Sequence, residues 1–520
     1  MPIRSFDGSS PSLLSLKINH LIVVVFANEH SLISHESLSH LNDLRIGVDA
    51  ACWLRRILYQ SAKEPCVMAM GGLPLSFERA LEQELQLFKQ YNIHLVVVFN
   101  GIMPLRKERP FSSEDRRPIS RQAGWDAFAR DRMDNAMSSW SSAGTVAQAD
   151  LHALAFKILR KHQVEFIRSP YAPLAQLAYF DRSNQGFVHA VYASNDYLLY
   201  DVDYLITYID FQRKTFGMLN KSKVLAAARI SPDQFMDASL LAGFEYINTF
   251  APLLESTIST GFNFQAALDM VRTHGNGFKA IQSYATHPSV AKAGYLDLFC
   301  RTRCMVNNHL VLNDNGQIQP LNVDQAPNDL HELIGPRLPE DYYFYLMQGL
   351  MSPTVLNFLT AGVTAIPAPL CNGDNVELQK FIKCKELTAM YQVALDLIRG
   401  PLHDHLKNKL ISFVYWFAPT QEVVFQPFSA VQGAFWQWQV PQDLAASLPK
   451  SAKAEFGVCL NLLANPSFAR KTVNPKAAAV SIQVSVSIFD CIDLMYIIGS
   501  KCRRFSSIGK VFASSWLGGA

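Results

Sequence analysis

The first 200 residues alternate between short apolar runs and amphipathic segments, and this alternation restricts the possible folds more than any other feature of the chain. The runs rich in β-branched residues, typical of strands, are 44–50, 94–101, 164–170 and 187–196. The segments with helical spacing are 51–61, 77–91, 150–163 and 173–183. Because strands joined through helices lie side by side in the same direction, we expect a parallel α/β sheet flanked by helices.

Three of the expected strands end in a polar residue: Asp49, Asn100 and Asp196. In open parallel sheets the carboxyl ends of the strands form the ligand crevice. Carboxylates gathered there are a common way to build metal sites for phosphoryl chemistry. Each residue alone is more simply explained as a cap of the turn or helix that follows. The three together favour a site.

A polar segment follows the second strand, from Gly101 to Arg132. It contains three aromatic residues, Phe111, Trp125 and Phe128, and five acidic residues. Its eight basic residues are Arg106, Lys107, Arg109, Arg116, Arg117, Arg121, Arg130 and Arg132. Interleaved basic and aromatic residues suit single-stranded nucleic acid, although a solvated charged loop or helix face has the same composition. Residues 137–148 are Ser-rich, and we interpret them as a linker.

Three motifs resemble the XPG and flap-endonuclease superfamily, whose fold is PIN-like. LRIGVDAACWL (44–54) resembles the N-region strand, and HLVVVFNGIMPLRKER (94–109) resembles the strand that normally reads V-F-D-G-x-x-P before a run of bases. VLAAARISPDQFMDASLLAGFEYI (224–247) resembles the internal-region helix and the G-S-D-Y element after it. The resemblance implies an XPG N-terminal-like region at 1–160 and an internal-like region at 161–290.

Carried over residue by residue, the resemblance implies a depleted metal site. Active members present about seven carboxylates for two divalent metals. Asp49, Asp196 and Glu245 stand at three ligand positions, and Asn100 replaces an aspartate. The remaining expected acids are replaced by Ala172, Leu174 and Leu198. We therefore expect no cofactor, or Mg²⁺ held by Asp49, Asp196 and Glu245 if the residual site is active.

The second half resembles the fungal maintenance-of-killer (Mkt-type) proteins, which pair an XPG-like half with a distinct C-terminal region. The similar segments are SPYAPLAQLAYF (169–180), which is equally acid-poor in that family, and the segment 328–362. The resemblance implies a helical or mixed Mkt-type region at 325–520 and a role in post-transcriptional control of messenger RNA. It also implies an ataxin-2-like partner that binds poly(A)-binding protein, and a location in the cytoplasm, with the nucleus as the alternative.

Charge and cysteine content narrow the function classes further. The 520 residues contain 47 Lys plus Arg and 44 Asp plus Glu, so the net charge of +3 excludes a protein that coats nucleic acid through bulk charge. Nine scattered cysteines without zinc spacing indicate reduced thiols. We expect no membrane anchor, because the apolar segment 477–499 alternates as a strand does and contains two aspartates.

Two segments do not match either family. Residues 18–40 add about a turn or a strand before Asp49, and the residues after about 475 do not resemble the Mkt-type ending. We interpret both as gene-model errors. Farther along, residues 380–398 have the pattern of one long amphipathic helix.

Three functions remain open from the sequence. The first is a catalytically inactive XPG-like scaffold in messenger-ribonucleoprotein complexes. The second is an active, metal-dependent, structure-specific 5′ endonuclease that uses Asp49, Asp196 and Glu245. The third is a module that binds mRNA or other single-stranded nucleic acid through the basic segment, which is compatible with the first.

Overall fold

The computed structural model describes residues 26–425, with gaps at 29, 62–63, 70, 105–116, 144–147, 257–263, 336, 354, 357–359, 361, 367–374 and 400–403. It divides near residue 349 into two compact units. None of the helices in these described ranges is long and apolar enough to cross a bilayer. The cysteines described are free thiols, at Cys52, Cys66, Cys300, Cys304 and Cys384.

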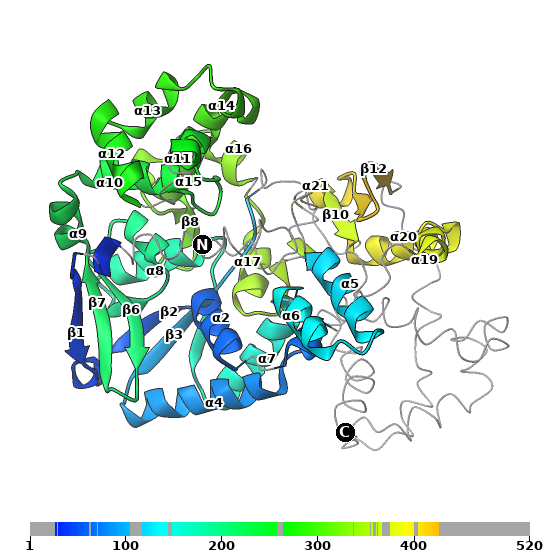
Figure 1. The fold of residues 1–520 in the computed structure, drawn as a ribbon, viewed down its shortest axis with the longest axis horizontal. Helices are drawn as coiled ribbons and strands as arrows, with labels where there is room; N and C mark the ends of the chain where they lie inside the picture. The colour runs from blue at the N-terminus through cyan, green and yellow to red at the C-terminus, as the bar shows by residue number, and fades with distance from the viewer. Residues whose placement is uncertain are drawn as a thin grey trace. The chain divides into compact units, whose positions relative to one another are not determined.

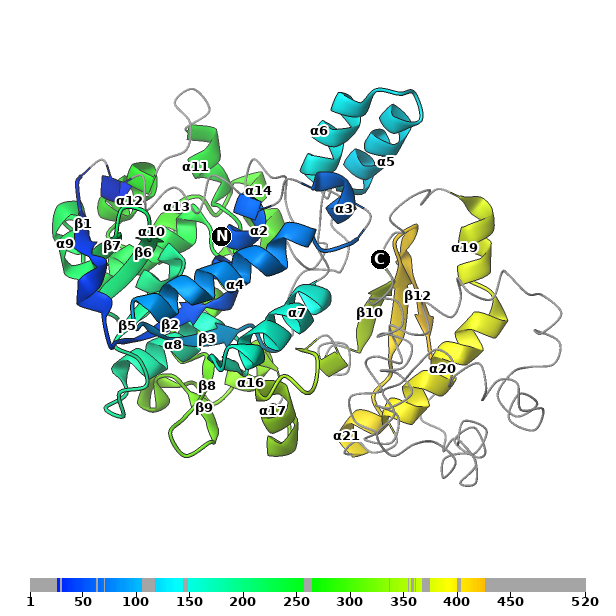
Figure 2. The same ribbon diagram turned by 90° about the horizontal axis from the view of Figure 1, so that it is seen from below.

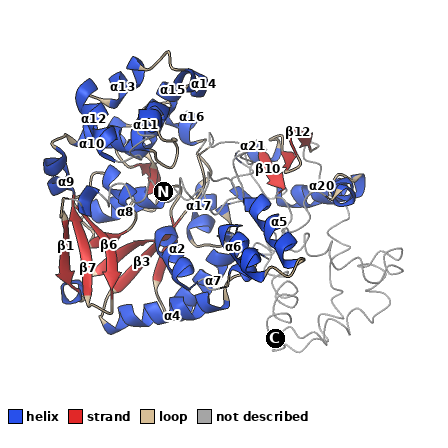
Figure 3. Cartoon of the chain, viewed as in Figure 1, coloured by secondary structure: helices blue, strands red, loops and turns tan. Residues whose placement is uncertain are grey.

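A seven-stranded mixed sheet forms the centre of the first unit, in the order β1-β7-β6-β5-β2-β3-β4 (Figures 1 and 3). Strands β6, β5, β2, β3 and β4 are parallel, and β7 and β1 are antiparallel additions at one edge. The strands are β1 Ile33–Ser37, β2 Arg45–Asp49, β3 His94–Phe99, β4 Glu165–Arg168, β5 Ala190–Tyr192, β6 Tyr204–Asp210 and β7 Thr215–Asn220. The predicted α/β class is confirmed.

The central strands are buried on both faces, which explains their continuous apolar sequences. In β3, Leu95, Val97 and Phe99 face one core, and Val96 and Val98 face the other. Helices α2 (Ala50–Ser61), α4 (Leu75–Gln90) and α7 (Gln148–Lys161) cover the first face (Figure 2). Helices α8 (Pro173–Arg182), α10 (Pro232–Ala242) and α12 (Phe264–His274) contribute to the second core.

Further short elements complete the first unit. These are α3 Pro65–Ala69, α5 Arg117–Phe128, α6 Met133–Ala143, α9 Lys221–Ala228, α11 Ala251–Ser256, α13 Gly277–Ser283, α14 Pro288–Ala293, α15 Tyr295–Asn308, β8 Leu310–Leu312, β9 Ile318–Pro320, α16 Leu330–Ile334 and α17 Glu340–Met347. Strands β8 and β9 form a hairpin. The first unit thus continues through α16 and α17, beyond the predicted region boundary at 325.

Two predicted elements are each divided in the structure. The segment 224–247 forms α9 and α10, because Arg229 adopts a left-handed conformation and Ser231 starts a new helix with a capping box to Gln234. The single helix predicted at 380–398 was also wrong. Two helices cover it, α19 (Val376–Ile382) and α20 (Lys385–Arg399), and Lys383 caps the first.

The segment before β2 is part of the fold from Phe26 onward. The Phe26 ring packs edge-to-face on Phe264 at 6.0 Å. Strand β1 pairs along its whole length with β7, from Ile33 opposite Leu219 to Ser37 opposite Thr215. The segment 18–40, which we interpreted from the sequence as a gene-model error, therefore supplies an edge strand through residues 33–37, and that interpretation was wrong.

After residue 350 the described chain contains a three-stranded sheet in the order β10-β11-β12. The strands are β10 Val363–Ile366, β11 Ser412–Tyr415 and β12 Ala418–Val424, and a short helix α21 spans Asp404–Lys407. The predicted strand at 477–499 and the residues after 475 lie outside the described residues.

Candidate functional site

The polar strand ends lie where the sequence analysis predicted, along one edge of the sheet. Asp49 ends β2, Asn100 follows β3, and Asp196 lies in a 3-10 helix (Asn195–Leu199) just after β5. Strand β2 pairs with β3 on one side and with β5 on the other, all in parallel. The three residues are therefore brought to the same carboxyl edge of adjacent strands.

Asp49 is almost completely buried, with 3% of its surface exposed. Its carboxylate accepts hydrogen bonds from the backbone N–H groups of Ala51, at 3.1 Å, and Cys52. Loss of hydration raises the pKa of Asp49 to about 6, although these bonds and the positive charge of Arg55 oppose the shift. The nearby charge of Glu245 adds to it. Asp49 is thus a carboxyl group that ionises with difficulty.

Glu245 and Asp196 lie near Tyr200, a buried residue in the turn after Asp196. Burial raises the pKa of the Tyr200 hydroxyl, and the charges of both acids raise it further. Glu245 also forms a hydrogen bond with Tyr246, and burial raises the pKa of the Tyr246 hydroxyl. The residues that replace the G-S-D-Y element therefore face the strand ends, as the resemblance implied. Their surroundings are tyrosine-rich.

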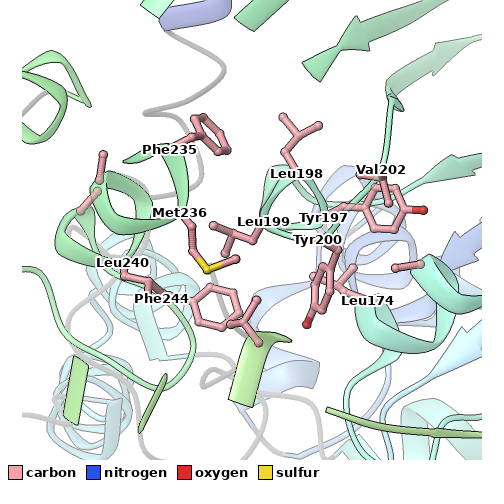
Figure 4. Packing of buried hydrophobic residues seen from close by; sticks show 14 of the residues in the cluster. Leu174, Tyr197, Leu198, Leu199, Tyr200, Val202, Phe235, Met236, Leu240 and Phe244 are labelled. Atoms are coloured by element: carbon pink, nitrogen blue, oxygen red, sulfur yellow. The ribbon is translucent and has the colours of Figure 1, made fainter. Parts of the chain in front are cut away.

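Packed apolar side chains occupy the three positions at which the resemblance to nucleases implied acids. Leu198 has no exposed surface, and Ala172 and Leu174 are 7% and 9% exposed. All three belong to one core cluster with Phe244 and Leu199 (Figure 4). At these places side chains fill the space in which carboxylates would have to meet a hydrated ion.

The donor set does not fit a magnesium site. Mg²⁺ needs near-octahedral oxygen ligands and binds chiefly through carboxylate charge. Asp49 resists ionisation, Asn100 carries no charge, and Ala172, Leu174 and Leu198 are apolar, so only Asp196 and Glu245 would add charge readily. Across the part of the chain that the structure describes, no three His, Cys, Asp or Glu side chains are grouped so that they could hold a metal ion. Asp49, Asp196 and Glu245 as metal ligands stay a prediction.

Strand β4, the neighbour of β3, ends in a buried cation that the sequence analysis missed. Arg168 is 5% exposed, donates to the Asn100 carbonyl oxygen at 3.0 Å and contacts His152 Nδ1 at 3.2 Å. Its guanidinium lies 4.9 Å from the centre of the Phe156 ring. Burial lowers the pKa of Arg168 to about 9, and the pKa of His152 well below its usual value. Arg168 ends β4 as Asp49 ends β2, so the strand-end pattern could have identified it.

Asn100 shares this environment. Its side-chain Oδ1 is buried and has no hydrogen-bond partner in the described ranges. The edge of the sheet at β3 and β4 thus presents an amide and a buried guanidinium, where a metal site would need anionic oxygens.

The basic segment forms part of a helical hairpin. Helices α5 and α6 pack through Trp125 and Trp140, whose rings lie 5.0 Å apart (Figure 2). Arg130 and Arg132, in the turn between them, are exposed, whereas Arg121 is 9% exposed. The bases Arg106, Lys107, Arg109 and Arg116 lie outside the described residues, and so does the Arg117 side chain.

The linker predicted at 137–148 was wrong for its first half, because α6 extends to Ala143. The Ser-rich composition suggested a linker, but Trp140 is buried against Trp125 and Cys66. Gly124 permits the close packing, since a Cβ there would lie 2.4 Å from the Trp140 ring.

Two family models match separate parts of the chain. The XPG N-terminal domain matches residues 17–122. The family described as "Temperature dependent protein affecting M2 dsRNA replication" matches residues 327–417. The first match includes β2 and β3, and the second begins just before α16.

Curated relatives align along most of the chain. The post-transcriptional regulator MKT1 of Cryptococcus neoformans is 28% identical over 489 residues, which are 88% of this chain and 62% of that protein. The regulators of the same name in Schizosaccharomyces pombe and Saccharomyces cerevisiae are 24% and 21% identical, over 69% and 76% of this chain. The aligned part covers 49% of the S. pombe protein and 59% of the S. cerevisiae protein. The chain thus spans less than two thirds of these relatives.

Two solved nuclease structures show a weaker similarity to the chain. The catalytic core of Rad2 in complex with DNA is 16% identical, with a TM-score of 0.35, over 56% of this chain and 81% of that chain. Flap endonuclease-1 from Methanococcus jannaschii is also 16% identical, with a TM-score of 0.34, over 52% and 81%.

Proposed function

We propose that this chain, a homologue of Mkt1 post-transcriptional regulators with an XPG N-terminal domain, controls messenger RNA after transcription as a non-hydrolytic scaffold. It would do so within ribonucleoprotein complexes. The homologues carry the regulator name, and the scaffold role follows from the strand-end edge of this chain.

The observation that supports the scaffold role is the packing at Leu198, Ala172 and Leu174. A two-metal nuclease needs negative charge around the scissile phosphate. Here three ligand positions are filled by apolar side chains, and the remaining buried acid, Asp49, has a raised pKa. Such an edge is suited to stable packing and poorly suited to holding divalent cations.

The partner that we propose is an ataxin-2-like protein that binds poly(A)-binding protein, and the proposed location is the cytoplasm. Both follow from the similarity of the second half to the Mkt-type region, which the family model at 327–417 supports. Co-purification of the tagged chain from cells tests the partner. Recovery of no ataxin-2-like or translation-associated protein above background would contradict it.

A tethering experiment tests the scaffold role directly. The full chain, fused to an RNA-binding peptide, is tethered to a reporter mRNA, and reporter protein and mRNA are measured. We expect the double variant Asp49→Asn, Glu245→Gln to change reporter output as much as the wild type does, because no hydrolysis is involved.

A nuclease assay provides the opposing outcome. Flap and single-stranded substrates are incubated with the purified chain and Mg²⁺ or Mn²⁺. We expect no turnover. Metal-dependent cleavage that the double variant abolishes would establish the alternative, an active 5′ endonuclease, and remove the scaffold proposal.

Direct contact with single-stranded nucleic acid is a second candidate, favoured by the α5–α6 turn. Arg130 and Arg132 are exposed there, and Phe128 beside them is 47% exposed. Two exposed cations next to an exposed ring supply phosphate contacts and a stacking surface.

Removing the two cations should reduce the salt dependence of RNA binding. Each phosphate contact with a single strand contributes a slope of about −0.7 to log K against log salt. We therefore expect Arg130→Ala, Arg132→Ala to reduce the slope by about 1.4 in titrations of a labelled 20-mer RNA. A matched control, Arg213→Ala, Lys223→Ala, removes two exposed cations elsewhere and should leave it unchanged. Equal slopes for both variants would exclude the α5–α6 turn as a contact.

A further inference from the structure

Among the described strands of the sheet, β4 is the last and pairs only with β3, and α17 packs against it. An edge strand exposes unpaired backbone groups that can pair with another chain unless something covers them. Helix α17 belongs to the segment that matches the second family model, 180 residues away in the sequence from the strand that it contacts.

The buried face of α17 is fixed by its tyrosine and leucine side chains. Tyr343 and Leu346 have no exposed surface. The Tyr343 hydroxyl lies 3.3 Å from the Tyr171 hydroxyl, and it accepts a hydrogen bond from the Leu338 N–H at 3.3 Å. On the opposite face Phe344 is 54% exposed. The helix thus has one buried face, held by hydrogen bonds, and one solvent-exposed face.

The end of α17 is held against the helix that precedes β4. Arg160 donates to the Gln348 carbonyl oxygen at 3.4 Å. Gly349 lies so close to Phe156 that a Cβ would approach its ring to 3.0 Å, and its φ of +65° favours glycine. These contacts fasten residues 338–349 at both ends.

Tyr171 connects this segment to the strand ends. Its carbonyl oxygen accepts from the Gly101 N–H at 2.9 Å, which joins the turn after β4 to the turn after β3. The Tyr171 ring also contacts His309, whose Nε2 lies 3.4 Å from the Tyr246 hydroxyl. The contacts that hold α17 therefore continue, through buried polar side chains, from Tyr343 and Tyr171 to Tyr246, beside Glu245.

We propose that residues 338–349 are a built-in cap, which covers the β4 edge and is locked by Tyr343 on Tyr171. The cap occupies the edge that a second copy of this chain would otherwise use for strand pairing. It opens as a local unit, while the rest of the sheet stays folded. The inference is independent of the proposed regulatory role.

Hydrogen exchange of the full chain tests the cap. We expect Tyr343→Ala to accelerate amide exchange at least about tenfold in 340–347 and in β4, 165–168, because the cap opens more often. Exchange in β7, which lies next to the opposite edge strand β1, should be unchanged. The matched control Phe344→Ala truncates an aromatic residue on the free face of the same helix and should behave as wild type. Light scattering should detect dimers of Tyr343→Ala only.

Tyr343→Phe separates the contribution of the Tyr343 hydroxyl bond from that of ring packing, since it removes only the hydroxyl. We expect it to accelerate exchange in 340–347 about fivefold, the effect of one buried hydrogen bond. Wild-type exchange in this variant would overturn the lock. Equal acceleration of β4 and β7 in Tyr343→Ala would show that α17 is part of the cooperative core, and unchanged β4 amides would show that α17 does not cover the edge. Either result would overturn the cap.

Discussion

Replacing Leu198 by aspartate, the residue type that the resemblance to active nucleases places there, should lower the free energy of unfolding by at least about 4 kcal/mol. Leu198 has no exposed surface and packs within the cluster that contains Tyr197 and Leu199. The variant loses the buried leucine contacts and also has to bury a carboxylate. We expect destabilisation, without a gain of metal affinity.

The measurement is denaturant unfolding with and without Mg²⁺. A Mg²⁺ concentration of about 5–10 mM is used so that even a weak carboxylate site would be saturated. Leu198→Met is the matched control, since a volume-conserving apolar exchange costs less than about 1.5 kcal/mol. If the aspartate variant kept its midpoint and Mg²⁺ raised it, the site would have room for a metal, and the proposal of a scaffold would lose its structural basis.

Asp49→Asn should stabilise the chain by up to about 3 kcal/mol at pH 7.5 and by little at pH 4. The pKa of Asp49 is raised from 3.8 to about 6 in the folded chain. At low pH the carboxyl group is neutral in both states and has no effect. As the pH rises from about 4 to 6, the unfolded chain ionises first, so folded stability is lost. Above pH 6 the loss is complete, about 2 pKa units at 1.36 kcal/mol each.

Asparagine removes this loss and keeps an oxygen that accepts from Ala51. Unfolding curves at several pH values measure the difference between variant and wild type. Asp324→Asn is the control, because Asp324 is exposed and its neutralisation should change stability by less than about 0.5 kcal/mol. A gain from Asp49→Asn that is equal at pH 4 and pH 7.5 would assign the effect to something other than ionisation.

The strand–helix order and the strand-end positions could be predicted because both depend on local periodicity. The continuous apolar run in 94–99 indicates a strand with two buried faces, and parallel neighbours bring Asp49, Asn100 and Asp196 to one edge. The helix divisions at Arg229 and Lys383 were missed, because apolar spacing continues across a local change in backbone conformation. The helix containing Trp140 was missed because contact with Trp125, and not local composition, stabilises it.

The sequence by itself determined the class of the sheet and the placement of the polar strand ends. These are properties of residue type and spacing, which need no knowledge of distant contacts. The apolar residues Ala172, Leu174 and Leu198 became informative through the resemblance to nucleases, which implied acids there. Only the tertiary structure decided that Asp49 is buried enough to raise its pKa and that Arg168 ends β4 as a buried cation. It also decided that α17 packs against β4. The physical reason is that the hydration of a side chain, its charged neighbours and the packing of α17 on β4 depend on segments that are far apart in the sequence, and no local pattern records their approach.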